Sequence, residues 1–266
     1  MAIHLKEERH RLILDAIEAD GRVTVSGLSR KLDVSEVTVR RDLQDLATRG
    51  LLQRSHGGAV LPNAASPEPP VLQRITETQA YKAQIGRAAA DLIPDGSSVF
   101  IGSGTTTAQV ARHLAGRKNL TVITNALNVA IELATAEGVT VVMTGGVMRK
   151  SELSLIGHLT ELALREVRVD RAVVGMQAIS LDNGMTNDHW PEVMTDRAVI
   201  QMAPELIVVA DHTKFGQVAS ALIAPVERIS TLVTDSLTDP ATLERFRHLG
   251  VRIIVTPAME AQPERR

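Results

Sequence analysis

Seven short runs of apolar residues recur after about residue 95, and segments with a helical spacing of apolar residues separate them. Runs that are apolar throughout are typical of strands buried on both faces, and a helix between consecutive strands favours parallel pairing. We therefore predict an α/β domain with a mostly parallel sheet that helices cover on both faces. The expected strands are 97–102, 120–125, 139–146, 171–175, 205–211, 229–235 and 251–255. The expected helices are 106–114, 126–134, 158–167, 191–203 and 241–249.

The segment LPNAASPEPPV marks a change in the character of the sequence. Four prolines stand there among small residues, which is typical of a stiff linker. We predict a first domain at 1–60, the linker at 61–74, the α/β domain at 75–257 and a polar tail at 258–266. A chain of 266 residues has room for two such domains.

The composition excludes several classes of protein. No apolar run is long enough to cross a membrane. A formal net charge of -2 cannot supply the counterion release on which non-specific DNA-binding proteins depend. Cysteine is absent, and the eight histidines, His189 and His212 among them, show no metal-ligand spacing. We expect a soluble, cytoplasmic protein without a metal or cofactor.

The first domain has the spacing and caps of three short helices. They cover 7–19, a segment that starts at 24 or 26 and ends at 32, and 36–49. Ser35 is a good N-cap for the third helix, in which Val39, Leu43 and Leu46 form one apolar stripe. Two short helices joined by a tight turn indicate a helix-turn-helix. The following LLQRSHGGAV predicts two strands and a glycine turn, so the domain is expected to be a winged helix.

The side of the third helix opposite the apolar stripe carries polar residues and cations. From residue 40 to residue 60 there are four arginines and two acidic residues, which places positive charge where DNA would lie. Asp42 is expected to cap or to form a salt bridge. The candidate contacts to double-stranded DNA are Ser35, Glu36, Thr38, Arg40, Arg41, Arg54 and His56. A helix-turn-helix that contacts another protein is the alternative.

Small or polar residues follow four of the predicted strands. Ligands of open parallel sheets bind at the carboxyl ends of the strands. The loop SGTTT offers hydroxyl groups and a helix N-terminus to an anion, and two cations lie close to other strand ends. This pattern predicts a pocket for a small phosphorylated, hydroxyl-rich molecule. The candidate residues are Ser103, Gly104, Thr105, Thr106, Thr107, Thr124, Asn125, Gly145, Gly146, Arg149 and Lys214.

The stretch VSEVTVRRDLQDLATRGLLQRSHGGAV resembles the winged helix-turn-helix signature of the DeoR family of bacterial transcriptional regulators. The RRDL step, the GLL after the helix and the HGGA wing carry the resemblance, which extends over the whole chain. It implies that the first domain binds an operator and that the second binds a phosphorylated sugar or related metabolite that relieves repression. Sensor domains of this family resemble ribose-5-phosphate isomerase. The resemblance adds Lys82, Glu192 and Asp211 to the effector contacts.

The sequence departs from the family pattern at two positions. Gly102 stands where the family usually has an acid, and Asp196 stands where it commonly has a lysine. An anion in place of a cation should change which ligands the pocket accepts, so the identity of the effector cannot be carried over from a relative.

The most consistent interpretation is a repressor of a carbohydrate or polyol catabolic operon. Reading an operator requires two reading heads at a fixed spacing, so we expect a homo-oligomer, either dimer or tetramer. The alternative is a sugar-phosphate isomerase with an added helix-turn-helix and Glu192 as its base. The absence of carboxylates at Val174 and Gln177 speaks against it. Trp190 could close the pocket, enter an interface or fill the core.

Overall fold

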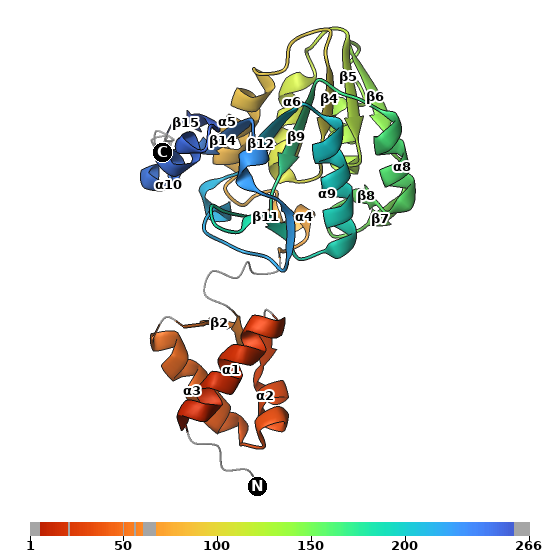
Figure 1. The fold of residues 1–266 in the computed structure, drawn as a ribbon. Coiled ribbons are helices and arrows are strands. Elements are labelled where there is room, and N and C mark those ends of the chain that lie inside the picture. The colour runs from red at the N-terminus through yellow and green to blue at the C-terminus, as the bar shows by residue number, and fades with distance from the viewer. Residues whose placement is uncertain (1–5, 21, 50, 56, 61–67, 258–266) are drawn as a thin grey trace, which may run out of the picture. The chain divides into compact units, whose positions relative to one another are not determined.

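The computed structural model describes residues 6–20, 22–49, 51–55, 57–60 and 68–257 (Figure 1). The chain divides into two compact units, 1–66 and 67–266. Each unit has a hydrophobic core of its own. His56, residues 61–67 of the predicted linker and the predicted tail lie outside the described residues.

The first unit contains three helices and a small antiparallel sheet. The helices are α1 (Lys6–Asp20), α2 (Val25–Leu32) and α3 (Glu36–Thr48). The strands β1 (Arg22–Thr24), β2 (Gln53–Ser55) and β3 (Gly58–Val60) pair in the order β1-β3-β2. The prediction of a winged helix-turn-helix is confirmed. Strand β1, which adds a third strand to the wing, was not predicted.

Caps in the sequence set where α2 and α3 begin. The Thr24 side chain accepts a hydrogen bond from the Gly27 amide at 3.1 Å, and Ser35 accepts one from the Thr38 amide at 3.2 Å. Between the helices, Asp33 has a left-handed backbone with φ of 51°, a conformation that aspartate tolerates better than most residues. The chain therefore turns between α2 and α3 within three residues.

The second unit is built on a seven-stranded parallel sheet with the order β15-β14-β12-β9-β4-β5-β6. Each strand corresponds to one of the seven predicted runs, so the predicted parallel sheet is confirmed. Strand β9 lies between β4 and β12, which brings the loops after these three strands together at one edge. The strands are β4 (Ser98–Ile101), β5 (Leu120–Thr124), β6 (Val139–Met143), β9 (Arg171–Gly175), β12 (Glu205–Val209), β14 (Thr231–Asp235) and β15 (Arg252–Thr256).

Six helices cover the two faces of this sheet (Figure 1). They are α5 (Gln79–Ala90), α6 (Thr105–Leu114), α7 (Leu127–Leu133), α8 (His158–Glu166), α9 (Trp190–Met202) and α10 (Pro240–His248). Apolar residues of α5, α6 and α7 share one core cluster with the sheet, and those of α8, α9 and α10 share the other. The prediction of helices on both faces is thus confirmed, although α5 was not among the predicted helices.

Several short elements in the second unit were not predicted. They are α4 (Val71–Arg74), the hairpin of β7 (Val147–Arg149) and β8 (Ser154–Ile156), and an antiparallel sheet of β10 (Ala178–Ser180), β11 (Gly184–Asn187) and β13 (Ala221–Ala224). Short 3-10 helices lie at His212–Lys214 and Val226–Arg228. Among the described residues, no helix has the length and apolar character needed to cross a membrane.

Close packing of α5 on α6 depends on Gly86. A Cβ atom at this position would lie 2.6 Å from Cβ of Gln109 and 2.7 Å from its carbonyl carbon. Gly86→Ala is expected to lower the free energy of unfolding by about 1–3 kcal/mol, because the helices must move apart. Gly116→Ala is the matched control, since no atom lies within 4 Å of a Cβ built there. Urea-induced unfolding measures both, and equal stabilities would contradict the prediction.

Candidate functional site

The start of α3 presents a polar face opposite its buried stripe. Val39, Leu43 and Leu46 are fully buried in the core of the first unit. On the other side, Glu36 and Arg40 are exposed and form an ion pair at 2.6 Å, one helical turn apart. The arrangement leaves a hydrophilic surface for a groove of DNA, as the helix-turn-helix geometry requires.

Arg41 and Asp42 are neighbours with opposite roles. Arg41 is exposed and makes no hydrogen bond or ion pair with any described residue, so its guanidinium is available to a partner. Asp42 is 2% exposed and accepts two hydrogen bonds from Arg9, at 2.7 and 3.0 Å. Its Oδ1 also lies 3.3 Å from Nε2 of His10. Asp42 therefore fixes α3 to α1, which confirms the predicted salt bridge.

The remaining predicted DNA contacts differ in how they are held. The hydroxyl of Ser35 lies 2.9 Å from that of Thr38, so this pair completes the cap of α3. Arg54 on β2 donates to the backbone carbonyl of Arg40 at 3.0 Å. Its guanidinium therefore lies beside α3, the reading helix, which is the one predicted to contact DNA. His56, the other predicted wing contact, lies outside the described residues.

A cavity of about 130 Å³ opens at the carboxyl ends of β4, β9 and β12 in the second unit. Its walls come from the loops after these strands, from Arg149, Glu152 and α9, and from the chain segment 68–82. Nine of the predicted effector residues line it: Lys82, Ser103, Gly104, Thr105, Thr106, Arg149, Glu192, Asp211 and Lys214.

The loop after β4 ends at the N-terminus of α6. Gly104 has φ of 131° and caps the helix without a side chain, so no side-chain hydrogen bond covers the first amides of α6. The first four N–H groups of a helix have no partner within it and attract an anion. Lys82 lies on the same cavity wall and donates to the carbonyls of Arg74 and Glu77, at 3.0 and 2.7 Å. Burial lowers the pKa of Lys82.

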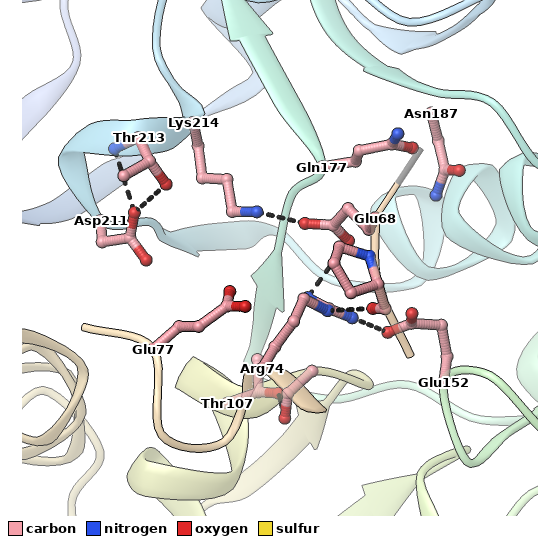
Figure 2. A network of polar contacts seen from close by, with 12 residues as sticks. Glu68, Arg74, Glu77, Thr107, Glu152, Gln177, Asn187, Asp211, Thr213 and Lys214 are labelled. Atoms are coloured by element: carbon pink, nitrogen blue, oxygen red, sulfur yellow. Dashed lines mark hydrogen bonds and ion pairs between the residues drawn. The ribbon is translucent and has the colours of Figure 1, made fainter. Parts of the chain in front are cut away.

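The loop after β12 carries Asp211 and Lys214. Asp211 caps the short 3-10 helix by accepting from the Thr213 amide at 3.0 Å, and it accepts from the Thr78 hydroxyl at 3.1 Å. Burial of Asp211 opposes its ionisation, but the hydrogen bonds from Thr213 and the charge of Lys214 lower its pKa overall. The ammonium group of Lys214 pairs with the carboxylate of Glu68 (Figure 2).

Glu192 is held from three sides at the start of α9. It is 5% exposed, pairs with Arg149, and accepts hydrogen bonds at 3.2 Å from Ser154 and from Asn187. Asp196 follows one turn later and also lines the cavity. Withdrawal from solvent and the neighbouring Glu192 carboxylate raise the pKa of Asp196 well above the usual range. The family commonly has a lysine at this position. The aspartate of this chain instead places a second carboxyl group near that of Glu192.

Five predicted effector residues do not line the cavity. They are Thr107, Thr124, Asn125, Gly145 and Gly146. Thr107 is fully buried and donates to the Gly104 carbonyl, and Thr124 donates to the Ile101 carbonyl at 2.6 Å. The other three follow β5 and β6, on the far side of β4 from β9 and β12. Asn125 donates to the Leu155 carbonyl on β8 at 3.1 Å, and Gly145 and Gly146 have φ values of 73° and 123°, which glycine adopts without strain.

Several cavity residues were not predicted from the sequence. Among them are Glu68, Arg74, Glu152, Gln177 and Asn187 (Figure 2). Glu68 and Arg74 fall in the segment predicted as linker, where the prolines dominate the pattern. Trp190 is 59% exposed and is not among the residues that line the cavity, so the interpretation of it as core filling is wrong.

An exposed reading helix in one unit and a polar cavity in the other are the features of a DNA-binding regulator that carries a sensor for a small ligand. Comparison with known proteins gives the family. A model of the DeoR-like helix-turn-helix domain matches residues 9–65, and a model of the DeoR C terminal sensor domain matches residues 77–236. The chain belongs to the DeoR family of transcriptional regulators.

Relatives of full length support this assignment. The chain is 34% identical over 250 residues to the putative aga operon transcriptional repressor of Escherichia coli O157:H7, covering 93% of each chain. It is 34% identical over 229 residues to the glycerol-3-phosphate regulon repressor of Escherichia coli K12, covering 86% of this chain and 90% of the relative. The family and these relatives identify a regulator and not an enzyme.

Likeness to solved structures is lower. Ribose 5-phosphate isomerase A of Methanocaldococcus jannaschii is 18% identical, with a TM-score of 0.39 over 52% of this chain and 55% of that chain.

The raised pKa of Asp196 has a measurable consequence. The native state keeps a proton on Asp196 at pH values where the unfolded state, with a pKa of about 3.9, has lost it. The contribution of Asp196 to stability therefore falls as pH rises above about 4, and Asp196→Asn removes this loss. We expect the variant to be more stable than wild type near pH 8, with a smaller difference near pH 5, by urea-induced unfolding. Asp188→Asn, which removes an exposed carboxylate from the same cavity, is the control; a pH-independent difference for Asp196→Asn would refute the assignment.

Proposed function

We propose that the protein represses a carbohydrate or polyol catabolic operon in the cytoplasm and that a phosphorylated sugar or related phosphometabolite relieves repression. The observation that carries this proposal is the cavity at the carboxyl ends of β4, β9 and β12. It combines a helix N-terminus without a side-chain cap, the cations Lys82 and Lys214, and several carboxylates. Such a site offers binding partners to a phosphate at one end and to hydroxyl groups elsewhere.

The relatives support the same class of ligand and target. Their names connect them with the aga operon and with the glycerol-3-phosphate regulon, and both are named repressors. Asp196 lines the cavity of this chain, so the bound sugar or polyol has to accept a carboxyl group at this position. The effector would act through its different affinity for the DNA-bound and released arrangements of the protein.

The test is fluorescence anisotropy with DNA from immediately upstream of the gene and its neighbours, at fixed salt. If Arg41 contacts a base, Arg41→Ala should weaken binding to the specific DNA by about 1–3 kcal/mol. If Arg41 contacts a phosphate, the variant should weaken binding to all DNA sequences alike. Unchanged affinity for specific and random DNA would remove Arg41 from the interface. Arg30→Ala is the control, because it also removes one exposed arginine, from the neighbouring helix α2.

The same assay, with a panel of phosphorylated sugars, glycerol 3-phosphate and their unphosphorylated parents, tests the sensor. Release by a phosphorylated compound and not by its parent is expected for wild type, and Lys214→Ala should bind DNA normally but resist release. Normal release of the Lys214 variant would place the effector elsewhere.

We also propose a homo-oligomer, a dimer or a tetramer, in which a second copy covers the β6 edge of the sensor sheet. Strand β6 ends the order of the seven-stranded sheet. Exposed apolar side chains gather on β6, β7 and α7: Ile131, Val142, Met143, Val147 and Met148, of which Ile131 and Val147 are 72% and 71% exposed. An unpaired strand edge with apolar side chains favours association. Reading two operator half-sites requires two copies of the chain, which makes a second copy the fitting occupant.

Val147→Asp is expected to shift the full chain towards monomer, because a charge would enter the proposed interface. Leu237→Asp is the matched control, since Leu237 is 55% exposed next to β14, near the opposite end of the sheet. Sedimentation velocity over a concentration series measures the change. The same oligomer distribution for wild type and both variants would rule out the β6 edge.

A further inference from the structure

The cations of the cavity are already bound by the protein itself. Among the described residues, Arg149 pairs with Glu192. Lys214 pairs with Glu68, and Arg74 pairs with both Glu68 and Glu152 (Figure 2). Lys82 donates to two backbone carbonyls. An anionic ligand can therefore reach a cation of this cavity only by sharing it with one of these partners or by displacing one.

Glu68 is the most exposed of these three carboxylate partners. The side chains of Glu152 and Glu192 are 8% and 7% exposed, and Glu192 has two further hydrogen bonds. The side chain of Glu68 is 20% exposed. It lies on extended chain ahead of α4, without helix or sheet hydrogen bonds at its own position.

The groups that hold Glu68 form an anion subsite. Lys214 pairs with one carboxylate oxygen, and Nη1 of Arg74 lies 3.2 Å from the other. Nη2 of Arg74 pairs with the buried Glu152, which keeps the guanidinium in place. Two cations on separate oxygens would bind a phosphate or carboxylate of a ligand in the same way.

We propose that Glu68 is a built-in competitor of the effector. An anionic group of the effector takes its place on Lys214 and Arg74 and releases the first residues of the sensor unit. This inference rests on the proposed function, because it requires an anionic effector in this cavity. Glu68 is the second residue of the unit that begins at Pro67, directly after the unit that reads DNA. Exchange of one carboxylate for a ligand anion would thus act on the chain that joins the two units.

The competition sets the size of the expected effect. If Glu68 occupies the subsite for about nine-tenths of the time, the apparent dissociation constant of a competing anion is about tenfold higher than the intrinsic one. Glu68→Gln removes the negative charge and keeps the shape of the side chain. It should therefore bind inorganic phosphate about tenfold more tightly than wild type, measured by isothermal titration calorimetry on the full chain.

Glu77→Gln is the matched control. Glu77 also lines the cavity and is exposed, and its side chain has no hydrogen bond or ion pair with any described residue. The substitution makes the cavity less negative by the same single charge. A general electrostatic effect would strengthen phosphate binding equally in both variants, whereas displacement of Glu68 predicts at most about a threefold change for Glu77→Gln.

A spin label tests whether the segment is released. The chain has no cysteine, so Pro69→Cys provides a single labelling site next to Glu68, where Pro69 is exposed. Phosphate should increase the mobility of this label in the electron paramagnetic resonance spectrum. With Glu68→Gln added, the label should be mobile without phosphate. A label at Leu237→Cys, 55% exposed and away from the segment, should not respond in either background.

The outcomes separate this inference from the proposed function. Equal phosphate affinity in wild type, Glu68→Gln and Glu77→Gln, with binding lost in Lys214→Ala, would overturn the role of Glu68 and leave the effector site in place. A tenfold gain in Glu68→Gln with an immobile label would overturn the release of the segment. No binding of phosphate or of any phosphorylated sugar to any variant would overturn both proposals.

Discussion

The parallel pairing of β9 between β4 and β12 is the constraint on which the sensor unit depends. Its register sets Ile101 of β4 opposite Val173 and Val209 of β12 opposite Gly175. Because the three strands run in the same direction, they end at one edge and deliver three loops to one place. The α6 N-terminus, Gln177 and the Asp211–Lys214 turn meet there only because these strands are neighbours. The sheet thus decides which polar residues form the cavity.

The cavity that results is rich in acids. Seven carboxyl groups and four cations line it, and in the described structure the four cations all have acceptors from the protein. An electrostatic trap for any anion would leave cations free. A ligand that donates hydroxyl groups to carboxylates and replaces one of them with its own anion fits this balance better. The excess of carboxyl groups over cations favours a hydroxyl-rich phosphorylated compound over a simple polyanion.

The sequence predicted the parts of the fold that repeat a pattern over many residues. The seven sheet strands were recognisable because each is an apolar run in the sequence, and five of them, β4, β5, β9, β12 and β14, are buried on both faces or nearly so. Helix α3 was recognisable from its cap at Ser35 and its stripe at Val39 and Leu43. The three-residue strands β7 and β10 show no period and were missed. Part of the site was missed for another reason. Which strand ends meet depends on strand order, so the residues after β5 and β6 were grouped with a cavity that forms over β4, β9 and β12.

The first unit limits how the second can control it. Asp42 fixes α3 to α1 through Arg9 and His10 in a buried cluster, and breaking a buried ion pair costs about 3–5 kcal/mol. Coupling between a ligand and a distant site typically supplies about 1–3 kcal/mol. A small ligand therefore lacks the free energy to reshape the reading helix. In the mechanism proposed above, control acts on the winged helix as an intact body. The first described residues of the sensor unit are the ones that Lys214 and Arg74 hold through Glu68.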